Sequence, residues 1–156
     1  MRFAYLSCIA FAVALAGCSS LPVVAIPKPS ASARAEVLVF REPSFIAGAV
    51  SLAVGTNGAA FASLSNSDYV VAELPPGEQE VFVQARTAEP TRVRVSLKHD
   101  TRTCLRTSAS SSTVAKVAIP VALMATGYHF YLDEVPCPSA EELAKYKLVP
   151  VSYAGG

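Results

Sequence analysis

Thr91-Arg92-Val93-Arg94-Val95-Ser96-Leu97-Lys98 alternates polar and apolar side chains without a break. In a strand, neighbouring side chains point to opposite faces, so Val93, Val95 and Leu97 share one face and the polar residues share the other. Alternation of polar and apolar side chains with a period of two is typical of an antiparallel sheet that has one face in solvent and the other on a core. This stretch predicts a mainly β protein.

Similar patterns lie on both sides of it. Residues 80–86 place two valines and Ala85 on one face, directly after a turn at Pro75-Pro76-Gly77. Asn57-Gly58 separates two strand-like runs and predicts a tight hairpin, because both positions of such a turn need positive φ. The other strand-like segments are 36–41, 49–54, 59–64, 69–74, 101–107, 128–135 and 148–153. About seven to nine short strands predict a small antiparallel β-sandwich.

Two segments do not follow the strand pattern. Residues 139–146 begin with Ser139-Ala140-Glu141-Glu142, a capping box that predicts one short C-terminal helix. Residues 113–125 are almost wholly apolar but contain Lys116 and Pro120. They are too short to span a bilayer, and the proline disfavours a long helix. We favour a kinked buried or edge strand there, and a hydrophobic loop that contacts a partner remains the alternative.

The first residues predict a secretory signal. Arg2 precedes an apolar run over residues 3–16, which is shorter than a membrane-spanning helix requires. The run ends in Leu15-Ala16-Gly17-Cys18, which resembles the bacterial lipobox. The resemblance implies cleavage before Cys18 and attachment of acyl chains such as palmitate to its thiol. Ordinary secretory cleavage with a free Cys18 is the alternative.

The predicted organisation follows from this cleavage site. Residues 1–17 are the signal peptide, residues 18–34 are a lipidated tether rich in proline and serine, and residues 35–153 are the sandwich domain. Retention in the inner membrane goes with aspartate directly after the lipidated cysteine, and Ser19 stands there instead. The resemblance therefore implies the periplasmic face of the outer membrane.

Charge and cysteine content narrow the function further. The formal charge is +1, and removal of residues 1–17 takes away one arginine and no acid. A neutral chain is not expected to bind nucleic acid through bulk charge. Cys104 and Cys137 remain as an even pair in an oxidising compartment, so we predict a disulfide between them, with two buried thiols as the alternative.

Two stretches resemble a family of uncharacterised bacterial exported lipoproteins. They are Val39-Phe40-Arg41-Glu42-Pro43-Ser44 and Leu74-Pro75-Pro76-Gly77-Glu78, and residues 128–132 match a later strand of that family. Glu42 separates the arginine from the proline, and Gln79 stands where the family has histidine. The second stretch is also similar to small PEGA-type β-domains. The resemblance spans about residues 35–150 and implies a β-sandwich in the envelope, with no activity to transfer.

Catalytic and metal-binding residues are not predicted. His129 and Asp133 are four residues apart on a strand, about 13 Å by strand rise, which is too far for a hydrogen bond. No Gly-x-Ser-x-Gly motif is present to supply a nucleophile. Neither His99 nor His129 has a familiar zinc-site spacing to the cysteines. We expect no enzyme activity, no metal and no cofactor.

The arginines of neighbouring strands suggest a binding face. Arg92, Arg94, Arg102 and Arg106 would bind an anionic glycan or lipid headgroup if their strands pair, and a solvated face balanced by acids is the alternative. The preferred hypothesis is a membrane-anchored, non-enzymatic scaffold or modulator of an envelope protein assembly. It would dock a partner protein through an exposed sheet edge.

Overall fold

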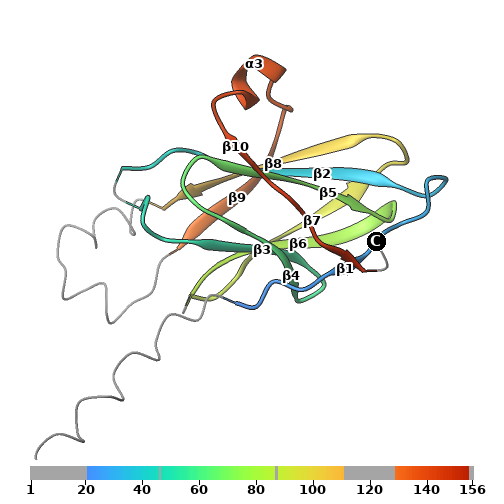
Figure 1. Cartoon of the computed structure of the whole chain (residues 1–156), viewed down its shortest axis with the longest axis horizontal. Coiled ribbons are helices and arrows are strands. Elements are labelled where there is room, and N and C mark those ends of the chain that lie inside the picture. The colour runs from blue at the N-terminus through green and yellow to red at the C-terminus, as the bar shows by residue number, and fades with distance from the viewer. Residues whose placement is uncertain (1–20, 46, 87, 111–128, 155–156) are drawn as a thin grey trace, which may run out of the picture.

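Two β-sheets pack face to face (Figure 1) in the computed structural model, which describes residues 21–45, 47–86, 88–110 and 129–154. The five-stranded sheet has the order β10 (Lys147–Val149), β5 (Asp68–Leu74), β2 (Ala35–Arg41), β8 (Arg102–Ala109), β9 (Phe130–Val135). The four-stranded sheet has the order β4 (Ala59–Leu64), β3 (Leu52–Thr56), β6 (Gly77–Ala85), β7 (Thr91–Leu97). The two remaining strands are β1 (Ile26–Pro27) and β11 (Tyr153–Ala154), and the short helix is α3 (Ala140–Leu143). The predicted mainly β sandwich with a short C-terminal helix is confirmed.

The core lies between the two sheets and comes from alternate residues of each strand. β2 turns Val37 and Val39 inward, and both are fully buried. β6 turns Val81 and Val83 inward, as its alternation predicts, and Phe61 of β4 is buried in the same core. Each fully buried side chain of this size contributes about 1.5–3 kcal/mol by leaving water, so these strands can hold the sandwich together.

The four-stranded sheet is antiparallel throughout, but the five-stranded sheet is mixed. The pairs formed by neighbouring hairpin strands are antiparallel, but β2 pairs with β8 in parallel and β10 pairs with β5 in parallel. A hairpin forces its two strands to run in opposite directions, whereas strands that are distant in sequence meet with either polarity. The expectation of an antiparallel sandwich therefore holds for the four-stranded sheet and for the β2–β5 and β8–β9 pairs, and is wrong for the β2–β8 and β10–β5 pairs.

A second apolar cluster lies on the outer face of the five-stranded sheet. Leu38, Phe40 and Cys104 are buried there beneath the segment that contains α3, which projects above this sheet in Figure 1. The capping box of α3 is present, since Glu142 N donates to Ser139 Oγ and Ser139 N donates to a Glu142 carboxylate oxygen. The helix ends at Leu143, three residues before the predicted end.

Contacts of the residues that follow α3 explain why the helix ends early. The ring of Tyr146 packs edge-on against Phe40, with centroids 5.7 Å apart. Lys147 N donates to the Ser67 carbonyl oxygen, which starts β10 beside β5. The chain therefore leaves the helix in order to join the sheet.

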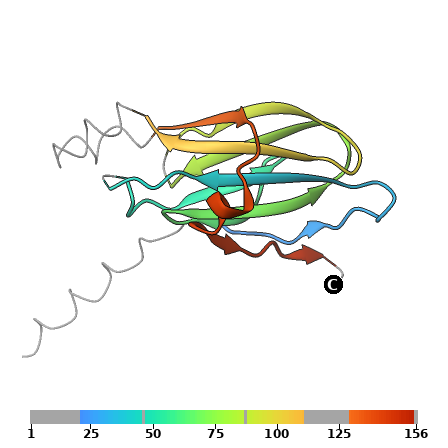
Figure 2. The same ribbon diagram turned by 90° about the horizontal axis from the view of Figure 1, so that it is seen from above.

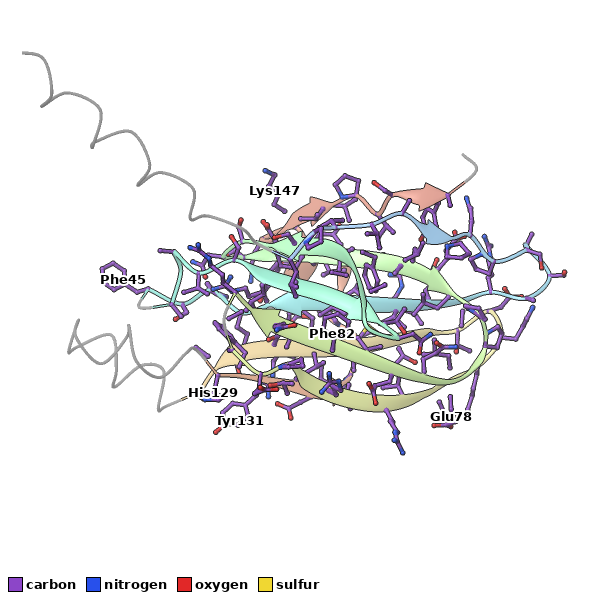
Figure 3. The ribbon with its side chains drawn as sticks, turned by 90° about the horizontal axis from the view of Figure 1, so that it is seen from below. Phe45, Glu78, Phe82, His129, Tyr131 and Lys147 are labelled. Atoms are coloured by element: carbon purple, nitrogen blue, oxygen red, sulfur yellow. A yellow bond between two sulfur atoms is a disulfide. The ribbon has the colours of Figure 1, made fainter. Side chains whose placement is uncertain are left out.

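The hairpin between β3 and β4 has the predicted turn. Asn57 and Gly58 both have positive φ, at 51° and 79°. Gly55 precedes them, and a Cβ on it would collide with the Phe82 ring and with the Ala59 carbonyl oxygen. Phe82 therefore lies over a glycine on the outer face of the four-stranded sheet (Figure 3).

The N-terminal arm, residues 21–34, packs on the sandwich, although the sequence predicts a spacer. Ile26 is buried, and the short strand β1 pairs in parallel with β11 (Figure 2). Val24 N donates to the Ala60 carbonyl oxygen at 2.8 Å, which places the arm beside the edge strand β4. The apolar residues of the arm explain the difference. They pack on the sandwich, and the prolines of the arm do not prevent this packing. In the part of the chain that the structure describes, no helix is long and apolar enough to cross a membrane.

Candidate interaction surfaces

The predicted disulfide is present. Cys104 on β8 is bonded to Cys137, which follows β9, and the two Cα atoms are 5.1 Å apart. Cys104 faces outward from the five-stranded sheet, so the bond ties the start of the α3 segment to that face. The free-thiol alternative is excluded.

The four arginines predicted to bind an anion lie on two opposite faces. Arg92 and Arg94 point outward from β7 in the four-stranded sheet, and Arg102 and Arg106 point outward from β8 in the five-stranded sheet. β7 and β8 do not pair, although they follow each other in sequence, so the condition for one shared basic face is not met.

The arginines of β8 are paired with acids on neighbouring strands. Arg102 Nη2 lies 2.7 Å from the Glu36 carboxylate. Arg106 lies 3.4 Å from Glu42 and 4.0 Å from Asp133. On β8, the arginines therefore lie on a solvent-exposed face where acids balance their charge, which was the alternative interpretation of the arginines.

The arginines of β7 are less completely matched. Arg92 Nε lies 3.2 Å from one Glu80 oxygen, and Arg94 Nε lies 4.0 Å from the other, so two guanidinium groups share one carboxylate. The Arg94 side chain is 83% exposed. Glu78 is the next acid on this face of β6. It lies opposite Ser96, which is two residues after Arg94 on β7. The outer face of β6 and β7 therefore carries Arg92 and Arg94 together with Glu78 and Glu80, and Arg94 is the more exposed of the two arginines.

An arginine that the sequence analysis did not select holds a loop in place. Arg41 ends β2 and is only 1% exposed. Its guanidinium donates to the carbonyl oxygens of Ala47 at 2.6 Å, Leu64 at 3.2 Å and Val50. Burial lowers the pKa of Arg41, and the carboxylate of Asp68 acts in the opposite direction. The guanidinium also lies over the Phe130 ring, 5.3 Å from its centroid.

The loop held by Arg41 presents an aromatic side chain to solvent. Phe45 is fully exposed and points away from the end of the sandwich (Figure 3). Ser44 N donates to the Asn66 side chain at 2.8 Å, and Ala47 N donates to Ser44 Oγ, so hydrogen bonds hold Ser44 and Ala47 in place. The signal in the sequence was the inward series Val37, Val39, Arg41, which places a charged residue where the core pattern requires an apolar one.

A shallow hollow of about 430 Å³ lies between the α3 segment and the five-stranded sheet. Phe40 and Tyr146 line it together with Glu42, Arg106 and Lys145, so its charges are mixed. Burial raises the pKa of the Tyr146 hydroxyl, and the Glu42 carboxylate raises it further. Within the hollow, Arg106 and Glu42 are paired with each other.

The remaining candidate residues are separated. Asp133 is close to Arg106, and His129 lies just before β9 near the end of the sandwich (Figure 3). Within residues 21–110 and 129–154, apart from positions 46 and 87, no three His, Cys, Asp or Glu residues cluster as metal ligands would. Cys18 and residues 113–125 lie outside the described residues.

The chain matches no protein-family model, no curated protein and no solved structure. Its surfaces must therefore be interpreted from their own chemistry.

Proposed function

We propose that this protein is a lipid-anchored, non-enzymatic envelope protein that scaffolds or modulates a protein assembly through its sandwich domain. The observation that carries the proposal is the apolar run of residues 3–16, which leads directly into Leu15-Ala16-Gly17-Cys18 at its end. Such a run with small residues before a cysteine favours cleavage and lipidation. Two or more acyl chains on Cys18 give membrane attachment that is stable, whereas a single chain binds only marginally.

The disulfide supports export. Cys104–Cys137 closes a long loop, and such bonds persist in oxidising compartments and are rare in the cytosol. Ser19 after the lipidated cysteine favours the outer membrane, by the lipobox resemblance. We therefore place the domain at the periplasmic face of the outer membrane.

Phe45 supports docking of a partner protein. A large apolar side chain in water gains free energy when a partner covers it, and aromatic residues dominate the binding energy of interfaces. The bonds from Arg41 and Asn66 hold Ala47 and Ser44, two described residues close to Phe45, so less conformational entropy is lost there on binding. The edge strand β9 adds Tyr131, which is also exposed at this end of the domain (Figure 3).

Substitution of the two N-terminal cysteines tests the anchor. We expect Cys18→Ala protein to leave the membrane fraction, whereas Cys8→Ala protein should stay there, because Cys8 is removed with the signal. Mass spectrometry of the mature N-terminus should show acyl chains on Cys18. A Cys18→Ala protein that remains fully membrane-bound would overturn the anchor.

The membrane assignment has a separate test. Ser19→Asp should move the protein from the outer to the inner membrane on a density gradient, if sorting follows the lipobox rule. Wild-type protein found only in the inner membrane would contradict the proposed location and leave the anchor itself intact.

Photocrosslinking tests the docking surface. A photoreactive residue at position 45 should capture one envelope protein reproducibly in living cells. The same residue at Lys98, which is exposed but lies in a turn after β7, should not capture it. Capture of glycan or lipid alone from position 45 would refute the scaffold proposal.

A further inference from the structure

The N-terminal arm is fixed to the domain along its length. Near its start, Leu21 packs on Ala53, Ala60 and Phe82, which belong to the outer face of the four-stranded sheet. Further along, Ile26 N donates to the Ser152 carbonyl oxygen at 3.1 Å as part of the β1–β11 pair. These contacts place the first described residue on one particular face of the domain.

The far end of the arm is held as well. His99 Nε2 lies 2.8 Å from the Ser32 carbonyl oxygen, and Asp100 N donates to the Arg34 carbonyl oxygen at 2.9 Å. Lys28 lies over the Tyr153 ring, 5.5 Å from its centroid. Hydrogen bonds and packing therefore connect the arm to β11 and to the turn before β8, so it does not act as a free spacer.

Covalent geometry then limits the distance between lipid and domain. Cys18 is three residues before Leu21, and an extended chain covers at most about 3.3–3.6 Å per residue, so their Cα atoms lie within about 11 Å. The acyl chains on Cys18 start from the membrane surface. Leu21, and the sheet face on which it packs, are consequently held at that surface.

The same face carries Arg92 and Arg94, the two arginines that share Glu80. Phe82, on which Leu21 packs, is directly opposite Arg92 in the register between β6 and β7, and Arg94 follows on the same face. Arginine binds phosphate oxygens with two parallel hydrogen bonds, and anionic headgroups attract basic side chains near a bilayer. The apolar side chains of Val23 and Val24 in the arm are 46% and 42% exposed and suit the interface between headgroups and acyl chains.

We propose that the bound arm holds the outer face of the four-stranded sheet against the phospholipid headgroups, with Arg92 and Arg94 at the phosphates. The five-stranded sheet, with α3 and the disulfide, then faces away from the membrane. This inference rests on the proposed lipidation of Cys18 and adds an orientation to it.

Single tryptophans can report the orientation, because the chain contains none. The reporters are Val23→Trp in the arm, Ser96→Trp on the outer face of the four-stranded sheet and Lys145→Trp after α3; all three positions are exposed. Lipidated protein is placed in vesicles of phosphatidylethanolamine and phosphatidylglycerol that contain a phospholipid with a nitroxide headgroup. We expect the nitroxide to quench the first two several times more strongly than the third.

A lengthened linker provides the matched control. Insertion of about twelve Gly and Ser residues between Ser20 and Leu21 leaves the docked arm unchanged and adds a root-mean-square reach of about 20 Å. The quenching of Ser96→Trp should then fall towards that of Lys145→Trp. Equal quenching of all three reporters without the insertion, or stronger quenching at position 145, would overturn the orientation.

Flotation separates this failure from failure of the anchor. Protein that does not float with the vesicles refutes lipid anchoring, whereas protein that floats with equal quenching refutes only the orientation. Arg92→Gln together with Arg94→Gln should reduce the quenching of Ser96→Trp, and Arg102→Gln on the opposite face should leave it unchanged. Unchanged quenching of Ser96→Trp in the double variant would show that Arg92 and Arg94 do not contact the headgroups.

Discussion

Replacement of Arg41 by alanine should destabilise the domain severely, although Arg41 is one of many arginines in the chain. The substitution removes a guanidinium that donates to three carbonyl oxygens, those of Ala47, Val50 and Leu64. It also removes the positive charge that faces Asp68, which is itself buried. The exposed loop residue Phe45 would lose its support at the same time.

The magnitude follows from the groups left without partners. A buried acceptor that loses its hydrogen bond costs about 1–3 kcal/mol, and the loop carbonyls can recover part of this by moving towards water. The attraction between the Arg41 charge and the Asp68 carboxylate is lost as well, but the two groups form no direct ion pair, so its loss costs less than that of a broken buried ion pair, which is about 3–5 kcal/mol. Since these two effects overlap, we expect a loss of about 4 kcal/mol in the free energy of unfolding. Arg41→Lys should lose less, because it keeps the charge but cannot reach three acceptors at once.

Urea unfolding followed by circular dichroism measures this loss, with unlipidated Cys18→Ala protein as the common background. Arg94→Ala is the matched control, since Arg94 is 83% exposed, and it should change stability by less than about 0.5 kcal/mol. Asp68→Asn should cost much less when Arg41→Ala is already present, because the two residues interact. A loss below about 1 kcal/mol for Arg41→Ala would refute the reasoning, as would strict additivity with Asp68→Asn.

Three further predictions concern other parts of the domain. Combined Cys104→Ala and Cys137→Ala should cost about 3–4 kcal/mol in urea unfolding, because the bond joins residues 33 apart; an unchanged midpoint would contradict this. Phe45→Ala should keep stability within about 0.5 kcal/mol but weaken co-purification of the crosslinked partner, and undiminished co-purification would exclude Phe45 from the interface. Hydrogen bonds from the Ser139 backbone and side chain lower the pKa of Glu142 from 4.5, so the contribution of Glu142 to the cap is complete above pH 4.5 and disappears as the pH falls through the lowered value. NMR titration should show the lowered pKa and a partial return towards 4.5 in Ser139→Ala; a pKa at or above 4.5 in the wild type would rule out the carboxylate's role.

Features set by neighbouring residues were predictable from the sequence. The alternation in residues 91–98 and 80–86 identified β7 and β6, and Asn57-Gly58 identified the hairpin, because side-chain period and turn conformation are local properties. The disulfide followed from counting cysteines in a chain that its first residues predict to be exported. The capping box of α3 was visible for the same local reason.

Features set by long-range pairing were not predictable in this way. β7 and β8 are joined by a short turn, and consecutive strands usually pair, yet here the chain crosses from one sheet to the other. That crossing separates Arg92 and Arg94 from Arg102 and Arg106. Similarly, the sequence of the arm predicts a spacer because its binding partner is β11, 127 residues away in sequence, and no local rule contains that pairing.

The arm and the Arg41 loop are connected in what they imply for a partner. The arm fixes one face of the domain relative to the lipid, and Arg41 fixes the loop that carries Phe45 relative to the domain. If both proposals hold, Phe45 is presented at a constant height and direction above the membrane, and a membrane-bound partner can meet it without an orientational search. A linker inserted before Leu21 would leave every contact of Phe45 intact but would remove that preset height. Reduced crosslinking from position 45 in such a protein would therefore show that the rigid mount, as well as the exposed aromatic side chain, contributes to binding.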